Sequence, residues 1–269
     1  MDITYGIVDA HCHIYPDKIA LKAVKAVETF YPTLPGDSLD GTCATLIRSG
    51  AENGVTHFIV HSVATTPHQV SSINRFIAQS VENSGGAFTG LGTMHPELEN
   101  IESAMDELVS LGLRGVKLHP DIQRFSADDP RIMPVYEFCE AKGLPVLVHT
   151  GDYRYDFSNP PRIANILRTF PKLNFIGAHF GGWSVWDEAA RTLTGFDNIT
   201  VDCSSAMHWL GEERTRALIC AWGEDRVMFG TDYPLWRQKP EIDLLLRLDL
   251  TDGAYRKIFR KNCMRIYGI

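Results

Sequence analysis

The sequence has no excess of basic residues and no apolar run long enough to cross a membrane. Its 26 Lys and Arg residues are outnumbered by 33 Asp and Glu residues, so the formal net charge is −7. A nucleic-acid surface normally carries a clustered basic footprint, and this balance argues against one. A membrane span needs roughly 20 consecutive apolar residues. We therefore expect a small-molecule partner, and neither nucleic acid nor a membrane.

The six cysteines do not form a CxxC pair anywhere in the 269 residues. A chain of this size does not need stapling, so the wide spacing indicates buried thiols in a reducing compartment rather than disulfides or a thiolate metal site. The first ten residues, MDITYGIVDA, lack the basic and apolar regions of a secretion signal. These absences together favour a cytoplasmic protein.

What the sequence does contain is an alternation of two kinds of segment. Short apolar segments rich in β-branched residues recur eight times, and longer stretches with helical spacing lie between them. Parallel neighbours need such crossovers, so the alternation predicts a parallel sheet. Eight repeats favour a closed (β/α)8 TIM barrel, an α/β fold that typically takes roughly 250 residues. The expected strands are 7–13, 57–63, 88–95, 115–120, 145–151, 174–182, 199–205 and 227–234.

Helices are expected between these strands, and residues 1–269 are expected to form one domain, because no linker or low-complexity tract interrupts the chain. The longest connection, 14–37, is rich in proline, which favours a loop. Loops of this length usually cover a site or are disordered, and the aromatic residues in it favour the first. The expected helices are 38–53, 67–82, 98–111, 130–142, 161–169, 185–193, 212–222 and a helical tail from about residue 241.

Polar residues gather at the C-terminal ends of the expected strands, which form the mouth of a barrel, where barrel enzymes place their chemistry. Side chains alternate along a strand, so His11 and His13 of DAHCH point to one face and Cys12 to the other. The same alternation puts Lys117 and His119 of GVKLHP on one face. The fifth, sixth and eighth strands end in VLVHTG, GAHFGG and FGTDYP, which contribute His149, His179 and Asp232.

These strand ends predict a site for one divalent metal ion, held by His11, His13, His149 and Asp232. Three imidazoles and a carboxylate suit Zn²⁺, which in a catalytic site keeps a further position for water or substrate. Mn²⁺, Fe²⁺ or Co²⁺ can use the same ligands, because selectivity often follows geometry and availability. An isolated HxH is weak evidence, since a single strand-end histidine is more often structural. The prediction depends on the whole set, in order.

In this order the motifs resemble the amidohydrolase superfamily, most closely its single-domain branch called amidohydrolase family 2. That branch includes aminocarboxymuconate-semialdehyde and γ-resorcylate decarboxylases besides many uncharacterised hydrolases. The resemblance spans the chain from the HxH to GTDYP. It implies the four metal ligands given above, with His179 working beside the metal on the reacting water or substrate. It also implies no flanking β-sandwich, since the first strand begins at about residue 7.

Two features of the resembling family leave alternatives open. Some relatives bind two metals through a carboxylated lysine on the fourth strand, so Lys117 is either a bridging carbamate or a buried or substrate-facing cation. Dimers are common in the family, so the resemblance allows a homodimer.

The main functional prediction is metal-assisted hydrolysis of a C–O or C–N bond in a small organic acid derivative, such as a lactone, ester or amide. The metal lowers the pKa of bound water from about 15.7 toward about 7, and Asp232 takes its proton while His179 acts as acid or base. The alternative, with the same ligands, is non-oxidative decarboxylation of an aromatic or muconate-type acid; a non-catalytic binding barrel is the third option. The predicted substrate-binding residues are Lys117, His119, Arg124, Arg154 and Trp183.

Overall fold

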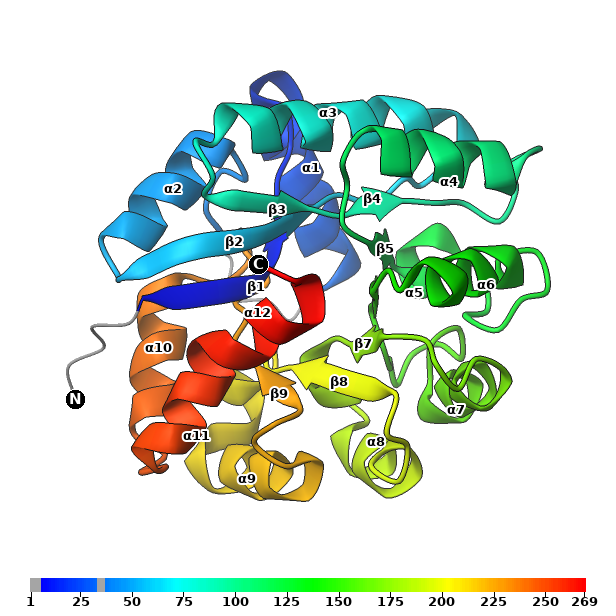
Figure 1. The fold of residues 1–269 in the computed structure, drawn as a ribbon. Coiled ribbons are helices and arrows are strands. Elements are labelled where there is room, and N and C mark those ends of the chain that lie inside the picture. The colour runs from blue at the N-terminus through cyan, green and yellow to red at the C-terminus, as the bar shows by residue number, and fades with distance from the viewer. Residues whose placement is uncertain (1–5, 33–36) are drawn as a thin grey trace.

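The computed structural model describes residues 6–32 and 37–269, which form a ring of parallel strands surrounded by helices (Figure 1). The third expected strand is interrupted at Leu91 and carries two labels, β3 and β4, so the nine labelled strands occupy the eight strand positions of the barrel. The predicted (β/α)8 barrel is confirmed. The strands are β1 Ile7–His13, β2 Val55–His61, β3 Phe88–Gly90, β4 Gly92–Thr93, β5 Val116–Leu118, β6 Val146–Val148, β7 Phe175–Gly177, β8 Ile199–Asp202 and β9 Val227–Met228.

Backbone hydrogen bonds close these strands into a barrel. The order is β1-β2-β3 in one sheet and β4 to β9 in sequence in the other, with every neighbouring pair parallel. At the interruption between β3 and β4, Leu91 N donates to Val60 O at 2.9 Å. At the closure of β1 on β9, Ala10 N donates to Phe229 O at 2.9 Å. Every described strand belongs to the barrel, so the described chain carries no flanking β-sandwich.

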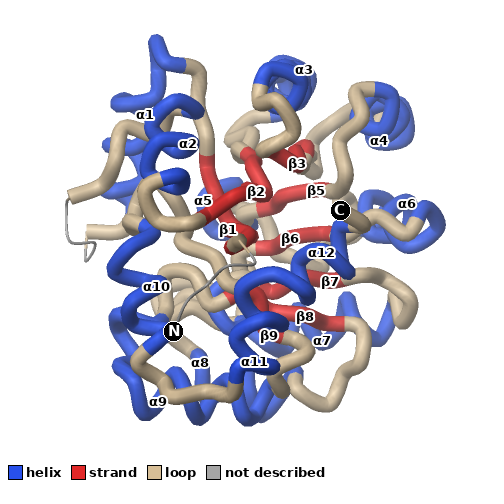
Figure 2. The backbone as a smooth tube through the Cα atoms, turned by 60° about the vertical axis from the view of Figure 1, so that its left-hand side comes forward, coloured by secondary structure: helices blue, strands red, loops and turns tan. Residues whose placement is uncertain are grey.

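Helices cover the outside of the barrel, and Figure 2 shows them around the strands. Caps that the sequence supplies start several of them; the Thr42 side chain, for example, accepts a hydrogen bond from Thr45 N. No described helix has the length and apolar character to span a bilayer. The α-helices are α1 Asp17–Phe30, α2 Cys43–Ala51, α3 Val70–Asn83, α4 Ile101–Ser110, α5 Pro120–Gln123, α6 Met133–Lys142, α7 Pro160–Thr169, α8 Trp186–Leu193, α9 Met207–Trp222, α10 Gln238–Leu246, α11 Asp252–Arg256 and α12 Asn262–Tyr267.

The connection expected to be a loop over 14–37 contains the fourteen-residue helix α1, so that expectation was wrong. The prolines that suggested a loop bound the helix instead: Pro16 occupies its N-cap and Pro32 lies just after it. Between them, Ala20 and Val24 are buried four residues apart, which is the spacing of one helical face. Residues 33–36 of the same connection lie outside the described part of the chain.

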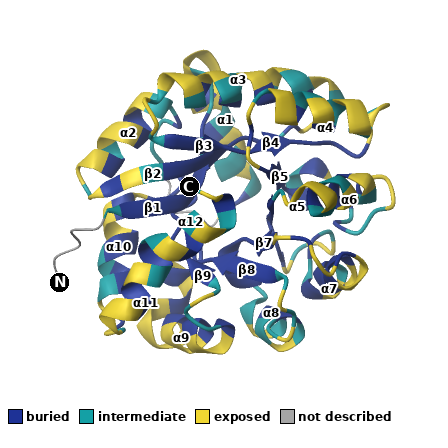
Figure 3. Ribbon diagram, viewed as in Figure 1, coloured by how far each residue is buried: buried dark blue, intermediate teal, exposed yellow. Residues whose placement is uncertain are grey.

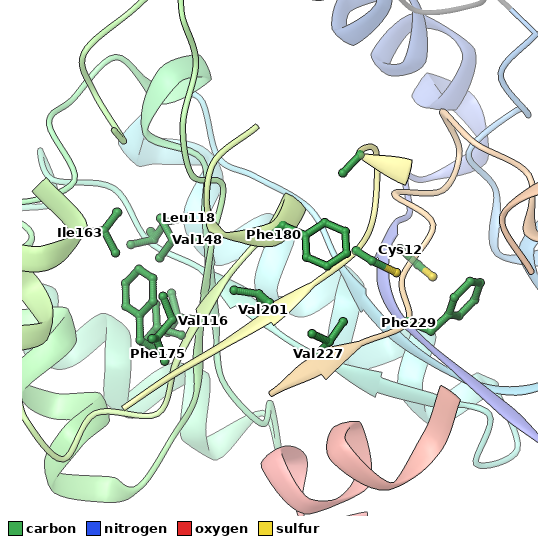
Figure 4. Close-up of a cluster of buried hydrophobic side chains, with 14 of the residues drawn as sticks. Cys12, Val116, Leu118, Val148, Ile163, Phe175, Phe180, Val201, Val227 and Phe229 are labelled. Atoms are coloured by element: carbon green, nitrogen blue, oxygen red, sulfur yellow. The ribbon is translucent and has the colours of Figure 1, made fainter. Parts of the chain in front are cut away.

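The core has an inner and an outer part. The strands are mostly buried, whereas the outward faces of the helices are exposed (Figure 3). The outer part lies between strands and helices, where for example Phe175, Ile163 and Val148 meet (Figure 4). The inner part, which we call the floor, fills the barrel and is closed at the N-terminal end of the strands by α12. The floor consists of Val8, Ala10, Ile59, Leu91, Leu147, Ile176, Ala178, Met228, Cys263 and Tyr267.

A β-bulge in β1 decides which of its side chains enter the barrel. Pairing with β2 shifts by one residue after Asp9, so that Ala10 and His11 together oppose Ile59. Ala10 joins the floor, and His11 lies above it at the mouth. Asp9 is on the other face, where its carboxylate accepts hydrogen bonds from Thr231 N at 2.9 Å and Thr231 Oγ1 at 2.6 Å.

Candidate metal and active site

Histidines from the ends of β1, β2, β5, β6 and β7 converge at the mouth of the barrel, where His119 after β5 stacks on His149. His11 and His13 from β1 lie against His61 from β2, with ring centroids of His13 and His61 4.4 Å apart. On the other side, His149 after β6 lies 4.8 Å from His179 after β7, and His11 and His179 are stacked at 5.2 Å. The predicted strand-end histidines therefore do meet in one place.

Asp232 joins the two histidines of β1. Its Oδ1 atom lies 3.3 Å from Nε2 of His11 and 3.3 Å from Nε2 of His13. The other oxygen accepts a hydrogen bond from Ser205 Oγ at 2.6 Å, which fixes the carboxylate. Asp232 follows β9 with a φ of 66°, a left-handed conformation that Asp adopts more readily than most residues. This turn directs its side chain into the mouth.

Protonation states make this trio suitable for a divalent cation. Burial, with the Lys117 ammonium nearby, lowers the pKa of His11 to about 4, and burial also lowers the pKa of His13. Burial opposes ionisation of Asp232, but His11 and His13 outweigh it and hold the pKa of that carboxyl well below its usual range. Neutral imidazoles beside an ionised carboxylate are the form in which these side chains bind metal.

His149, the fourth predicted ligand, lies in the same chamber but contacts different partners. Its Nδ1 is 3.0 Å from His179 Nε2, and its Nε2 is 3.1 Å from Gly151 O. Among the described residues, the donor atoms within 4.8 Å of one another fall into three sets: His11, His13 and His61; His11, His179 and Asp232; His119, Asp121 and His149. The metal role of His149 stays a prediction.

His11 is oriented from behind by Asp202, a residue that the sequence interpretation missed. The distance from His11 Nδ1 to Asp202 Oδ2 is 2.9 Å, so Nδ1 holds the proton and Nε2 faces Asp232. Burial alone would raise the pKa of Asp202, but His11 and the hydrogen bonds around it hold that pKa below its usual value. A carboxylate behind a ligating imidazole fixes its tautomer and strengthens it as a ligand.

Lys117 lies fully buried beside the trio. Its Nζ is 3.1 Å from His11 Nε2, and burial lowers its pKa to about 8, against the opposing effect of Asp232 and Asp202. An ammonium in this position can attract an anionic group into the mouth. The bridging carbamate on Lys117 stays an untested alternative.

His61 is not among the predicted site residues, because a single histidine near a strand end is weak evidence. It is fully buried, and neither of its ring nitrogens has a hydrogen-bond partner in the described structure. Burial, together with His13 and Lys117 nearby, lowers its pKa well below the usual value. A usable signal was present, because His61 follows the floor residue Ile59 by two positions and so shares its inward face.

Tyr31 reaches into the mouth from the end of α1. Its hydroxyl lies 3.2 Å from Nε2 of both His119 and His149, whose rings stack 3.9 Å apart. The segment between β1 and β2 therefore covers the site, as expected, although as a helix and its following residue. The pKa of the Tyr31 hydroxyl is raised by burial, so the group stays protonated.

Arg154, predicted to bind substrate, ties α1 to the segment after β6. Its Nη2 pairs with Asp152 Oδ2 at 2.6 Å, and its Nη1 donates to Phe30 O at 2.6 Å. Its guanidinium lies 4.8 Å from the centroid of the Tyr31 ring and 5.7 Å from that of Trp183. The cation is thus already paired within the protein, and it holds the two sides of the mouth together.

A cavity of about 580 Å³ opens from this site toward the surface. Its wall includes most of the predicted site residues: His11, His13, Lys117, His119, His149, His179, Trp183 and Asp232. Arg154 and Arg124 are absent from the described wall. Arg124 is exposed at the C-terminal end of α5, in a left-handed conformation.

The chain matches the amidohydrolase family over residues 8–269, and it belongs to that family of enzymes, as the motifs predicted. A curated relative, 2-amino-3-carboxymuconate-6-semialdehyde decarboxylase of Dictyostelium discoideum, is 26% identical over 202 residues. The match covers 60% of this chain and 55% of that relative, so the chain spans about half the length of the curated relative it matches.

Solved structures share the barrel. An uncharacterised TIM-barrel protein from Bordetella bronchiseptica has a TM-score of 0.81 at 21% identity, covering 97% of this chain and 98% of that one. A dihydroxybenzoic acid decarboxylase from Polaromonas, solved with bound manganese, has a TM-score of 0.73 at 16% identity, covering 98% of this chain and 97% of that one. At these identities the likeness shows the fold.

Proposed function

We propose that this protein is a metal-dependent, non-oxidative decarboxylase of a small organic acid. The observation that carries the proposal is the contact of His11, His13 and Asp232 with one another, beside the buried ammonium of Lys117, at the inner end of a single cavity. Two of the relatives described above are decarboxylases by name, which favours this alternative over the hydrolysis that the sequence interpretation ranked first.

The metal ligands we propose are His11, His13 and Asp232, with His149 completing the set. When bound, a divalent cation supplies Lewis-acid polarisation of a substrate oxygen. Zn²⁺ is our first choice from the donor types, and Mn²⁺ is the second, since it occupies the Polaromonas relative. Metal analysis of the purified protein decides between them.

The reaction exchanges a carboxylate for a proton at carbon, so the chain must hold an anion and deliver one proton. Lys117 attracts the carboxylate of the substrate into the mouth. Asp232 is held ionised by its histidine neighbours, which suits a ligand better than a proton donor. His179 donates from Nδ1 to Ser204 O at 2.8 Å, which leaves Nε2 as the nitrogen that can exchange a proton.

In the proposed step, the proton held at His179 Nε2 is transferred to the substrate carbon that carries the carboxylate. The bond between that carbon and the carboxylate then breaks, its electron pair returns to the unsaturated system, and CO₂ leaves. The nearly complete burial of Lys117, His149 and His179 keeps the reacting groups away from bulk water. Low local dielectric strengthens the attraction between Lys117 and a bound carboxylate.

The test is a paired assay of the protein reloaded with Zn²⁺ or Mn²⁺. CO₂ release is measured from a panel of hydroxybenzoates and muconate-type acids, and ring opening is measured from lactones and esters. We expect CO₂ equal to the acid consumed, with no hydrolysis, and we expect His179→Asn to abolish CO₂ release while retaining metal. Lactone or ester hydrolysis without CO₂ would restore the first prediction. Full metal uptake with no turnover of either panel would leave a non-catalytic barrel.

The free cysteines support our further proposal of a cytoplasmic location. All six lack a disulfide partner, and Cys12, Cys139, Cys203 and Cys263 are buried. Buried free thiols are typical of proteins kept in a reducing compartment.

A further inference from the structure

The cavity continues past the histidines into a second region with a different wall. We call this region the apolar arm; it lies between α1 and α3 and is lined by Ile19, Ala23, Val27, Ile73 and Phe76. The polar side chains near it, Thr65, Gln69 and Ser72, carry no charge. Beyond the mouth residues, Lys18 is the one charged side chain in the described wall, and it is exposed.

The face of α1 that forms the arm is apolar, although its side chains are at most partly buried in the described structure. Ile19, Ala23 and Val27 recur every four residues, so they share one face of the helix. None of the three belongs to either core cluster or to the half-buried side chains packed against one. Ile19 is 44% exposed. This apolar stripe of α1 is thus directed at the cavity and not at the core, and a ligand in the cavity can cover it.

The size of the cavity exceeds what a one-ring acid fills. Its volume is about 580 Å³. A non-hydrogen atom takes up at most about as much room as one water in the liquid, about 30 Å³. The cavity therefore has room for at least about 20 such atoms, against roughly ten in a one-ring acid. With the acid group among the histidines, about half of the space remains, and that half is the arm.

The charges at the mouth limit the substrate to one acid group. Lys117 is the buried side-chain cation of the described wall, because Arg154 is paired with Asp152 and contributes nothing to that wall, while Lys18 is exposed. A second carboxylate placed deep in the arm would be desolvated with only the exposed ammonium of Lys18 near the arm to pair with it, which is unfavourable. A neutral apolar group gains free energy on entering the same space.

From these observations we infer that the substrate is a monocarboxylic acid with an extended apolar substituent, an alkyl chain or second ring of about ten non-hydrogen atoms, that occupies the arm. The inference rests on the proposed function for its acid end. It also disfavours a substrate with two carboxylates far apart.

The experiment measures binding, by isothermal titration calorimetry, of 2-hydroxybenzoates carrying no chain or a 4- or 5-ethyl, butyl or hexyl chain to the metal-loaded protein. A matched acid carries a terminal carboxylate on the hexyl chain. We expect each added methylene to tighten binding about fourfold until the arm is full. The acid with the terminal carboxylate should lose that gain.

Variants of α1 separate the arm from the exposed side of the same helix. Ala23→Trp fills the arm, so the hexyl acid should no longer bind more tightly than the unsubstituted acid. Leu21→Trp, at a position 72% exposed, should keep the difference in affinity between the two acids. Val27→Arg places a cation in the arm and should tighten binding of the acid with the terminal carboxylate. Thermal melts show that each variant is folded.

Failure of the arm and failure of the proposed function give different results. If the hexyl acids bind no more tightly than the unsubstituted acid, the inference that the arm holds an apolar substituent is wrong, even if CO₂ is released. If Leu21→Trp removes the affinity difference between the hexyl and unsubstituted acids as Ala23→Trp does, the chain does not bind in the arm and the inference is also wrong. If the chain-length gain is present and no acid of the series releases CO₂, the arm stands and the decarboxylase proposal falls.

Discussion

The two ends of the barrel are built from the same strands but differ in every chemical respect. On β6, Leu147 belongs to the floor and His149, two residues later, faces the mouth. On β1 the sequence passes from Ala10 to His11 at the same boundary. The floor is apolar and closed by α12, whereas the mouth holds buried imidazoles, carboxylates and an ammonium. Residues that stabilise the fold and residues suited to chemistry thus lie only one or two positions apart along the same strand. This division between the two ends of the strands is typical of barrel enzymes.

The largest effect is expected from breaking the mouth. Asp232→Asn removes the carboxylate that contacts His11 and His13, and with it several kcal/mol of metal-dependent stabilisation of the transition state. We expect CO₂ release to fall by about 10³-fold or more, with bound metal also reduced. The measurement is the turnover rate per folded protein, alongside metal content. Unchanged metal content and turnover would remove Asp232 from the site.

Breaking the floor should give the opposite pattern. Leu147 is completely buried among apolar side chains, so Leu147→Ala leaves a cavity and should lower the free energy of unfolding by about 2–5 kcal/mol. Turnover per folded, metal-bound molecule should change little. Chemical denaturation gives the first quantity and a rate at low temperature the second. A large loss of turnover in folded protein would show that floor and mouth are coupled.

A substitution of Asp202 tests whether a residue that contacts His11, but does not itself face the cavity, affects metal binding. Asp202→Asn keeps the shape but removes the charge that faces His11 Nδ1, and we expect metal affinity to weaken about 10- to 100-fold. Competition with a chelator measures this. Ser205→Ala, which removes a hydrogen bond to Asp232 but no charge, is the milder comparison and should weaken metal binding less.

Acid should destabilise the mouth before the floor. Burial lowers the pKa of His61, His119 and His149 well below their usual values, so these histidines stay neutral in the folded protein. The unfolded chain takes up protons below about pH 6.5, so the stability that these groups contribute is fully present above that pH and is lost as pH falls, by up to about 1.4 kcal/mol per histidine per unit. Melts of the metal-free protein at pH 8 and pH 5.5 measure this. His119→Gln should flatten the dependence, whereas Leu147→Ala should not.

Much of the fold could be predicted because it depends on repetition. Eight alternations of strand and helix segments fix a barrel whatever the errors at individual boundaries. The segment with α1 was misjudged because proline has two uses: Pro16 and Pro32 bound a helix as readily as they occur in a loop. The interruption between β3 and β4 could not be predicted from hydrophobicity, because Leu91 is itself an apolar residue.

The site was predictable where several residues supported one another. His11, His13 and Asp232 were chosen as a set, and they lie in contact. His61 and Asp202 were missed because each is a single polar residue at a strand end, whose partners lie far away in sequence. Arg154 was considered free for a substrate, since its pairing with the α1 segment depends on a tertiary contact that sequence spacing does not reveal.

The bulge in β1 makes the inward orientation of His11 depend on one additional residue in the strand. With Asp9 outside the barrel, strict alternation would send the His11 side chain outside as well. One additional residue lets an outward acid and an inward imidazole coexist two positions apart. Exchange of Ala10 for another small residue should therefore be tolerated, whereas its deletion would turn either the imidazoles out of the barrel or the Asp9 carboxyl into its apolar interior.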